Sequence, residues 1–205
     1  MKIGLDMDEV LAEFMGGFCE FYNSKFSTDI SSLNLKRYAI SPLVGGTHED
    51  GLKLVDDFHD SEFFDRMTLV EGAREALSLL GGHELIVVTA RPRGFKEKTD
   101  KFLKTNFPDN TFRVFYSSEV HGHEGTKTKE EICNELGIKI LVEDNGEYAP
   151  KYARSGIKVL LLDKPWNRDC EEHENIIRVS NWDEVVEKIN EFEKMNLEFE
   201  GVKDG

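Results

Sequence analysis

The chain opens with Lys2-Ile3-Gly4-Leu5-Asp6-Met7-Asp8-Glu9-Val10-Leu11-Ala12-Glu13-Phe14, and this stretch decides the fold. Its short apolar start predicts a buried strand that ends in two carboxylates, Asp6 and Asp8. Helical spacing of apolar residues begins at Val10. Ligands of open α/β sheets bind outside the carboxyl ends of the strands, so we expect a site at the end of this first strand.

Apolar runs alternate with helical patterns along the rest of the chain. Parallel strands need crossover connections, which are usually helices, so this alternation predicts a sheet with helices on both faces. We therefore expect an α/β fold with a Rossmann-like parallel sheet. The further strands are expected at 84–89, 112–116, 139–142 and 158–162, and the helices at 9–26, 73–80, 96–107, 129–136, 147–155 and 183–194.

The first crossover is too long for a single helix. About 80 residues separate the first strand from the end of the second, whereas one βαβ unit needs about 30. The surplus, at 14–67, contains short amphipathic pieces and no alternating strand. We expect it to be a small helical cap that closes over a ligand and excludes water. Residues 1–13 and 68–195 would form the core, and 196–205 an acidic, flexible tail.

The composition excludes several classes of protein. The formal net charge is −14, whereas binding a nucleic acid polymer normally needs a basic patch. No apolar run approaches the roughly 20 residues that span a bilayer, and the opening residues lack the apolar stretch of a signal peptide. We therefore expect a cytoplasmic protein with no membrane contact. The sequence leaves the oligomeric state open, with a homodimer as one alternative.

Cysteine and histidine show no metal or disulfide framework. The three cysteines are widely spaced and form no Cys-x-x-Cys pair, so reduced thiols are expected. His121 and His123 lack the further ligands of a structural zinc site, and we expect them on a surface loop.

Three polar groups follow the opening acidic pair in chain order. Each ends an apolar strand or lies at the start of a helix, on the same edge of the predicted sheet. Any one of them alone is more simply a turn or surface residue, but the ordered set indicates a single site. The groups are Thr89, then Lys127 and Lys129, then Glu143-Asp144.

This ordered set resembles the four motifs of the haloacid dehalogenase superfamily, over the chain to about residue 165. Members of that superfamily share a Rossmann-like fold and are mostly Mg²⁺-dependent phosphohydrolases. A closer similarity is to the 5'(3')-deoxyribonucleotidase family, in which the cap also follows the first motif. It rests on four segments, namely Asp6–Phe14, Phe63-Phe64, Thr89-Ala-Arg-Pro92 and Asp163-Lys-Pro-Trp-Asn167.

The resemblance implies catalytic roles. Asp6 would be the nucleophile that forms an aspartyl-phosphate. Asp8 would protonate the leaving alkoxide and then deprotonate the attacking water. Thr89 would hold a phosphate oxygen by its hydroxyl, together with the backbone amides of Ala90 and Arg91.

Positive charge must offset the repulsion between a carboxylate and a dianionic phosphate, and by resemblance Mg²⁺ and one lysine supply it. Lys129 is favoured because it opens the helix, and Lys127 is the alternative. Mg²⁺ prefers oxygen ligands and retains waters, so three protein ligands suffice. They would be Asp6, Asp144 and the backbone carbonyl of Asp8, with Glu143 behind them.

The expected substrate is a small phosphorylated molecule, most simply a 5'- or 3'-(deoxy)nucleotide. By resemblance Phe14 would line the base, and so, more weakly, would Phe63 or Phe64. For each of the three, core packing is favoured over base stacking, because aromatic residues usually bury area. Since the cap sequence is the least recognisable part, a phosphatase for another small metabolite is the alternative function. A non-catalytic nucleotide- or phosphate-binding protein is a further one.

Overall fold

Six parallel strands form a single sheet at the centre of the computed structural model, which describes residues 1–118 and 127–201. The predicted α/β fold with a Rossmann-like parallel sheet is confirmed. Beyond the predicted strands there is β6, a short and mostly half-buried edge strand that lacks a fully apolar run. The strand order is β3-β2-β1-β4-β5-β6. The bounds are β1 (Lys2–Leu5), β2 (Glu84–Thr89), β3 (Arg113–Tyr116), β4 (Ile140–Glu143), β5 (Lys158–Leu162) and β6 (Ile176–Val179).

The strand order reverses beside β1, which pairs with β2 on one side and with β4 on the other. Leu5 is in register with Val87 of β2 and with Val142 of β4. The chain adds strands outward from β1 to β3 and then returns to place β4 on the opposite side of β1. A crevice forms at such a reversal, outside the carboxyl ends of the strands. The topology therefore puts the residues after β1 and β4 at one site.

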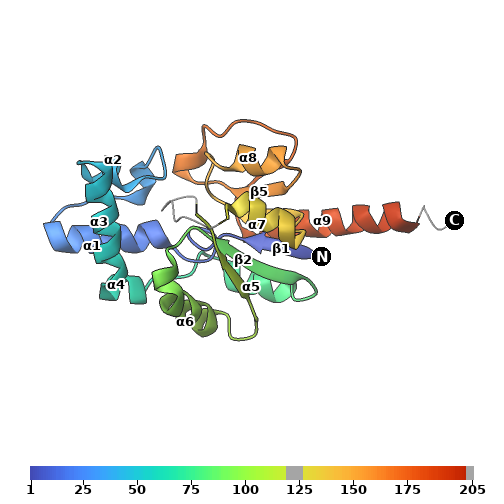
Figure 1. Ribbon diagram of the computed structural model, residues 1–205, viewed down its shortest axis with the longest axis horizontal. Helices are drawn as coiled ribbons and strands as arrows, with labels where there is room; N and C mark the ends of the chain where they lie inside the picture. The colour runs from blue at the N-terminus through green and yellow to red at the C-terminus, as the bar shows by residue number, and fades with distance from the viewer. Residues whose placement is uncertain (119–126, 202–205) are drawn as a thin grey trace.

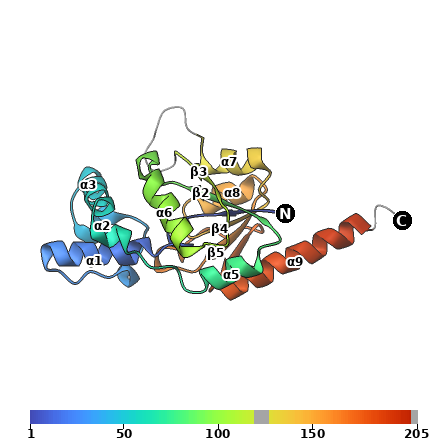
Figure 2. The ribbon, with the colours of Figure 1, turned by 90° about the horizontal axis from the view of Figure 1, so that it is seen from below.

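Helices cover both faces of the sheet because alternate strand side chains point to opposite faces. One core contains Leu5, Val87 and Val142 and packs against α5, α6 and α9. The other contains Val88 and Leu141 and packs against α7 and α8. Figure 2 shows α7 and α8 on one side of the sheet and α5 and α9 on the other. The bounds are α5 (Ala73–Leu79), α6 (Lys96–Asn106), α7 (Lys129–Leu136), α8 (Ala149–Arg154) and α9 (Trp182–Gly201).

The surplus between β1 and β2 is helical and lies to one side of the sheet, at the left of Figure 1. Its chain leaves and re-enters the core side by side, since Glu13 N donates to Thr68 O at 3.0 Å and Val70 N donates to Leu11 O at 3.0 Å. We call residues 14–67 the cap. Its helices are α1 (Phe14–Phe26), α2 (Ile40–Val44), α3 (His48–His59) and α4 (Glu62–Asp65).

Both ends of the chain differ in detail from expectation. The first helix begins at Phe14 rather than near Glu9, because residues 9–12 make a tight turn in which the Leu11 and Ala12 amides bond to Met7 O. The last helix continues past the expected end near Lys194 to Gly201, and it extends away from the body in Figure 1. His121, His123 and the last four residues of the expected tail lie outside the described residues. Among the described helices, none has the length and apolarity that crossing a membrane requires.

Two adjacent glycines in α1 test how tightly the cap is packed. A Cβ on Gly17 would lie 3.0 Å from Met67 Cγ and 3.2 Å from Phe58 Cζ, whereas a Cβ on Gly16 would approach only Glu13 Cβ, at 3.8 Å. Both Gly→Ala changes gain the same helix propensity, so any difference in stability between the two variants reports the steric contacts of the added methyl group. We expect Gly17→Ala to be less stable than Gly16→Ala by about 1–3 kcal/mol in urea unfolding. Equal stability of the two variants would contradict this packing.

Candidate active site

Asp6 lies directly after β1 and extends its pairing with β4, since Asp6 N donates to Val142 O at 3.0 Å. The side chain is buried, with 8% of the residue exposed. Its Oδ1 accepts a hydrogen bond from Met7 N at 2.7 Å and lies 3.0 Å from Lys129 Nζ. Both contacts fall on Oδ1 and hold the carboxylate in one orientation, and within residues 1–118 and 127–201 no hydrogen bond to Oδ2 is formed.

Lys129 is the lysine that reaches the site. It is the first residue of α7, and a capping box between Thr128 and Glu131 fixes the start of that helix. Lys129 Nζ lies between Asp6 Oδ1, at 3.0 Å, and Glu143 Oε2, at 2.8 Å. Lys127, the alternative, instead pairs with Glu135 on the surface. Two residues along the chain thus separate a buried ammonium from a solvated one.

The acidic pair after β4 completes the cluster. Glu143 is fully buried; its Oε1 accepts from the amides of Asp144 and Asn145, at 3.2 and 3.1 Å, while Oε2 meets Lys129. Asp144 Oδ2 accepts a hydrogen bond from Trp166 Nε1 at 2.8 Å. Carboxylate oxygens of Asp6, Glu143 and Asp144 lie within 4.8 Å of one another. Three acids this close need compensating positive charge.

The pKa values of the buried groups show the effect of this crowding of negative charge. Burial and then the charge of Glu143 raise the pKa of Asp6 well above its ordinary value. Burial and the charge of Asp6 do the same to the pKa of Asp144. Burial lowers the pKa of Lys129, but the charges of Asp6 and Glu143 outweigh that effect and raise it. Clustered hard oxygen donors that one lysine does not neutralise fit a divalent cation such as Mg²⁺.

Asp8 has a partner that the sequence did not suggest. The guanidinium of Arg91 donates from Nε to Asp8 Oδ2 at 2.9 Å and from Nη2 to Asp8 Oδ1 at 2.5 Å. Sequence reasoning assigned only the backbone amide of Arg91, for a phosphate. That amide donates to Thr89 Oγ1 at 3.1 Å. Thr89 itself is buried, with 1% exposed.

A cavity of about 450 Å³ lies between the sheet edge and the cap. The core side contributes charged groups and the cap side contributes mainly aromatic and apolar ones. This volume and mixture are typical of small-molecule sites. Core residues that line it include Asp6, Asp8, Ala90, Arg91, Lys129, Glu143 and Asp144, and cap residues include Phe14, Met15, Tyr38, Ile40, His48, Val55 and His59.

The three phenylalanines expected to contact substrate separate in the structure. Phe14 lines the cavity and packs edge-on against Phe58, with ring centroids 5.2 Å apart. Phe64 is buried behind Arg91, and Phe63 packs on Phe21 and Arg66, so neither is among the lining residues. Adjacent residues of a helix point about 100° apart and do not face one cavity together. Direct substrate contact by Phe63 or Phe64 therefore does not match the geometry.

The cap also supplies site residues that sequence reasoning missed. Tyr38 lines the cavity and packs on Trp166, with ring centroids 5.5 Å apart. Burial and then the charges of Asp8 and Glu9 raise the pKa of Tyr38 well above its ordinary value. No motif marks Tyr38. Its neighbour Trp166 lies in the Asp163–Asn167 segment that carries part of the resemblance, and it donates a hydrogen bond to Asp144.

Glu9 connects the site to the cap. Its backbone takes the left-handed φ of 62°, which is uncommon for a residue other than glycine. The side chain is buried, and Oε1 accepts a hydrogen bond from Met15 N at 2.5 Å in the first turn of α1. Lys164 Nζ lies 3.6 Å from Oε2. Burial outweighs that partner and raises the pKa of Glu9 to about 8.

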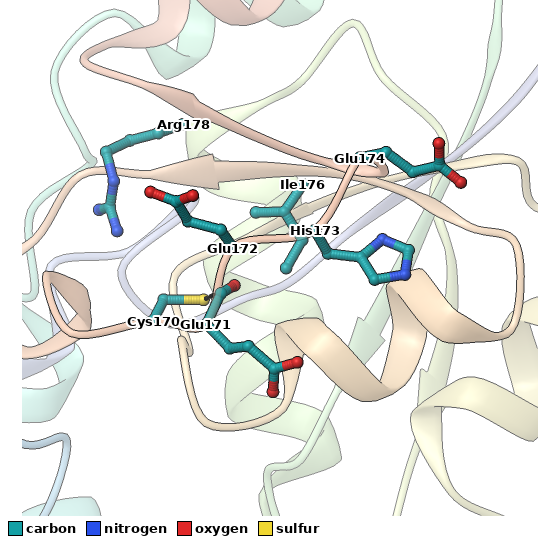
Figure 3. Close-up of a pocket in the computed structure, with 7 residues that line it drawn as sticks. All are labelled: Cys170, Glu171, Glu172, His173, Glu174, Ile176 and Arg178. Carbon is teal, nitrogen blue, oxygen red and sulfur yellow. Dashed lines mark hydrogen bonds between the residues drawn. The ribbon is translucent and has the colours of Figure 1, made fainter.

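A second cavity, of about 520 Å³, lies on the surface at β6 and at the loop that precedes it, and is shown in Figure 3. Three glutamates, Glu171, Glu172 and Glu174, line it beside a single arginine, Arg178, so the net negative charge of the lining disfavours a phosphate. Burial raises the pKa of the Cys170 thiol there, so the thiol stays protonated. The chemistry of a phosphate ester therefore belongs to the cavity between the sheet and the cap.

The sequence matches one known protein family over almost its whole length. A family model described as "5' nucleotidase, deoxy (Pyrimidine), cytosolic type C protein" matches residues 1–194. A nucleotidase of Clostridium acetobutylicum is 26% identical over 190 residues, which are 90% of this chain and 91% of that protein. YqfW of Bacillus subtilis, whose name assigns it provisionally as a nucleotidase, is 26% identical over 196 residues, 93% of this chain and 94% of that protein.

Solved structures share the fold. One is described as a "predicted phosphatase from Clostridium acetobutylicum" and superposes with a TM-score of 0.64 at 19% identity, covering 93% of this chain and 98% of that one. Another is described as the "putative HAD-hydrolase YfnB from Bacillus subtilis bound to magnesium". Its TM-score is 0.59 at 14% identity, over 92% of this chain and 98% of that one.

The buried position of Lys129 can be tested through stability. In Lys129→Met, Asp6 and Glu143 lose their shared cation inside the protein. We expect the free energy of unfolding at pH 7 in EDTA to fall by about 3 kcal/mol. Lys127→Met, which removes an exposed pair, should change it by less than about 0.5 kcal/mol. Equal effects in urea unfolding would show that Lys129 does not hold the cluster together.

The raised pKa of Glu9 predicts a pH dependence. In the unfolded chain Glu9 ionises near its ordinary pKa of 4.5, whereas in the folded chain it keeps its proton to about pH 8. Its contribution to stability therefore falls as the pH rises between these values. Glu9→Gln cannot ionise, so its stability relative to wild type should rise by about 1–4 kcal/mol from pH 5 to pH 8.

The measurement is urea unfolding at both pH values in EDTA. Gly16→Ala, which retains Glu9, should follow the wild-type pH dependence. A constant difference between Glu9→Gln and wild type across this range would mean that Glu9 is ionised in the folded protein.

Proposed function

The chain belongs to the 5' nucleotidase, deoxy (pyrimidine), cytosolic type C family, and from that premise we propose that it is a Mg²⁺-dependent nucleotidase. The chain is a phosphoric monoester hydrolase of the haloacid dehalogenase superfamily. The finer proposal is that it releases phosphate from a nucleoside monophosphate through an aspartyl-phosphate on Asp6. The observation that carries it is the contact of Asp6 with Lys129 at 3.0 Å, inside a cluster of buried acids.

The proposed metal ligands are Asp6, Asp144 and the backbone carbonyl of Asp8. When bound, Mg²⁺ would neutralise charge on the phosphate oxygens and on the surrounding acids. Trp166 orients Asp144 through its hydrogen bond to Oδ2. Glu143, with both oxygens already engaged, holds Lys129 and the turn after β4 rather than a metal.

The proposed reaction has two steps. Asp6 Oδ2 attacks phosphorus, the bond from phosphorus to the ester oxygen breaks, and Asp8 gives its proton to the departing alkoxide. Water then attacks the aspartyl-phosphate, Asp8 takes the proton from that water, and Asp6 and inorganic phosphate are released. Lys129 favours the ionised form of Asp6 that the first step requires. Thr89 is proposed to support the phosphate at the end of β2.

The cap is proposed to choose the substrate. Its contribution to the cavity is aromatic and apolar, with Phe14, Tyr38 and His59 among the lining residues. A nucleobase offers a flat face that such side chains pack against. The nucleotidase names of the relatives support the same substrate class.

The test is phosphate release from deoxy- and ribonucleoside 5'- and 3'-monophosphates and from sugar phosphates, with Mg²⁺ or with EDTA. We expect turnover of nucleoside monophosphates only with the metal. Asp6→Asn should lower kcat by at least about 10⁴-fold with an unchanged circular dichroism spectrum. Asp109→Asn, an exposed position in the loop before β3, serves as the matched control and should keep wild-type activity.

Each other outcome removes a part of the proposal. A preference for sugar phosphates would replace the nucleotidase by a phosphatase for another metabolite. Turnover in EDTA would contradict the proposed requirement for Mg²⁺. Full activity of Asp6→Asn would remove Asp6 as the nucleophile.

A further inference from the structure

We propose that Arg91 positions the carboxylate of Asp8 for proton transfer, and that the cap holds Arg91 in place through Phe64. This inference rests on the proposed function, in which Asp8 is the acid and base. It assigns the Arg91 side chain to Asp8 rather than to the substrate. It also gives Phe64, which does not line the cavity, a part in the chemistry.

Arg91 and Asp8 form a bidentate salt bridge, called the fork below. Arg91 Nε and Nη2, on one edge of the guanidinium, meet Asp8 Oδ2 and Oδ1 at 2.9 and 2.5 Å. Two parallel bonds fix the plane of the carboxylate as well as its position. The side chain of Arg91 is 2% exposed, whereas that of Asp8 is 17% exposed and lines the cavity. The pair thus has a buried support and a carboxylate that remains open to substrate.

Arg91 is held on its other sides by protein. Nη1 donates to Thr99 Oγ1 at 3.2 Å, and Thr99 is fully buried in α6. The ring of Phe64 lies 5.0 Å from Arg91 Cζ, within cation–π range. One N–H donor on each of Nε, Nη1 and Nη2 is therefore engaged by Asp8 or Thr99. The edge of the guanidinium that carries Nε is thus occupied by Asp8, and a phosphate could meet only the second N–H donors of Nη1 and Nη2.

The cap docks on the segment that carries Arg91. His59, at the end of α3, stacks on Phe95 with ring centroids 3.9 Å apart and an interplanar angle of 18°. Lys98 Nζ donates to His59 O, and Phe64 and Phe95 also approach, with centroids 6.4 Å apart. The segment that joins α3 to α4 therefore packs against the start of α6. Phe64, in α4, belongs to this contact and also packs on the guanidinium of Arg91, which holds Asp8.

The chemistry separates positioning from binding. A misplaced Asp8 slows proton donation to an alkoxide, and it slows proton removal from water in the second step. A p-nitrophenolate leaves as a stable anion and needs no proton, so only the second step suffers with p-nitrophenyl phosphate. The first step then releases about one p-nitrophenol per active site before slow turnover. That burst is the signature of a damaged acid and base beside an intact nucleophile.

The experiment compares wild type with Arg91→Lys, Arg91→Met and Phe64→Leu. For the nucleoside monophosphate that wild type hydrolyses best, we expect both Arg91 variants to lower kcat by about 10²–10³-fold, with KM changed less than about threefold. With p-nitrophenyl phosphate they should show a burst near one equivalent. Phe64→Leu should follow the same pattern, with a decrease in kcat of about 10-fold.

Matched controls come from the same elements. Arg93→Lys changes an exposed arginine two residues along the chain, and Phe26→Leu changes an exposed phenylalanine of the cap, and both should keep wild-type kinetics. Circular dichroism and thermal melting test whether each variant is folded. If Arg91→Met fails to fold, Arg91→Lys retains the charge and loses only the fork.

The results that overturn the inference are distinct. A raised KM with unchanged kcat would assign Arg91 to substrate binding. An equal loss on both substrates without a burst would make Arg91 merely structural, and wild-type kinetics in Arg91→Lys would remove its role. In each of these cases wild type still hydrolyses nucleotides and Asp6→Asn does not, so the proposed function stands. If wild type hydrolyses none of the phosphate esters, the proposed function fails and this inference fails with it.

Discussion

The rest of the site depends on the two buried ion pairs that Lys129 forms with Asp6 and Glu143. The lysine ammonium lies between Asp6 and Glu143, and so one buried cation joins the end of β1, the start of α7 and the end of β4. Three carboxylates within 4.8 Å would repel one another strongly at low dielectric. Lys129 offsets only part of that repulsion. The remaining negative charge supports the proposal that a divalent cation binds here and offsets the charges of the acids and of a phosphate.

The architecture allows this cluster because the strand order reverses beside β1. Asp6 and Asp144 follow neighbouring strands that are far apart in the sequence, and parallel pairing brings their ends to one edge. The cap is inserted at the same edge, directly after the first acidic pair. Its two connections run side by side, and its aromatic residues complete the cavity. The sheet edge therefore supplies the charged residues of the cavity, and the cap supplies most of its aromatic and apolar residues.

The cap does more than cover the cavity, because individual cap residues contact residues of the site. Glu9 bonds to the first turn of α1, Tyr38 packs on Trp166, and Phe64 packs on Arg91. Each of these links ends on a residue that touches an acid of the site or follows one directly. The cap and the charged cluster are thus one packed unit. The cap therefore contacts the residues around the carboxylates through side chains as well as through the backbone.

Much of the fold was predictable because it depends on local pattern. Apolar runs and helical spacing indicated five of the six strands and a parallel sheet, while β6 was missed because its sequence is short and only partly apolar. The order of Asp6, Asp8, Thr89, a lysine and Asp144 pointed to a site because parallel strands end at one edge. The sequence leaves Phe63 and Phe64 as alternatives, because it does not show which face of a short helix lies against the core.

The sequence by itself determined the fold class, the helical insert and the set of polar residues at the strand ends, because strand and helix periods are properties of neighbouring residues. Only the tertiary structure decided between Lys127 and Lys129, joined Arg91 to Asp8, and brought Tyr38 and Trp166 to the acids. These contacts join residues from 14 to 128 positions apart in the chain. Their geometry depends on how the cap and the sheet pack together, and no local pattern encodes that packing.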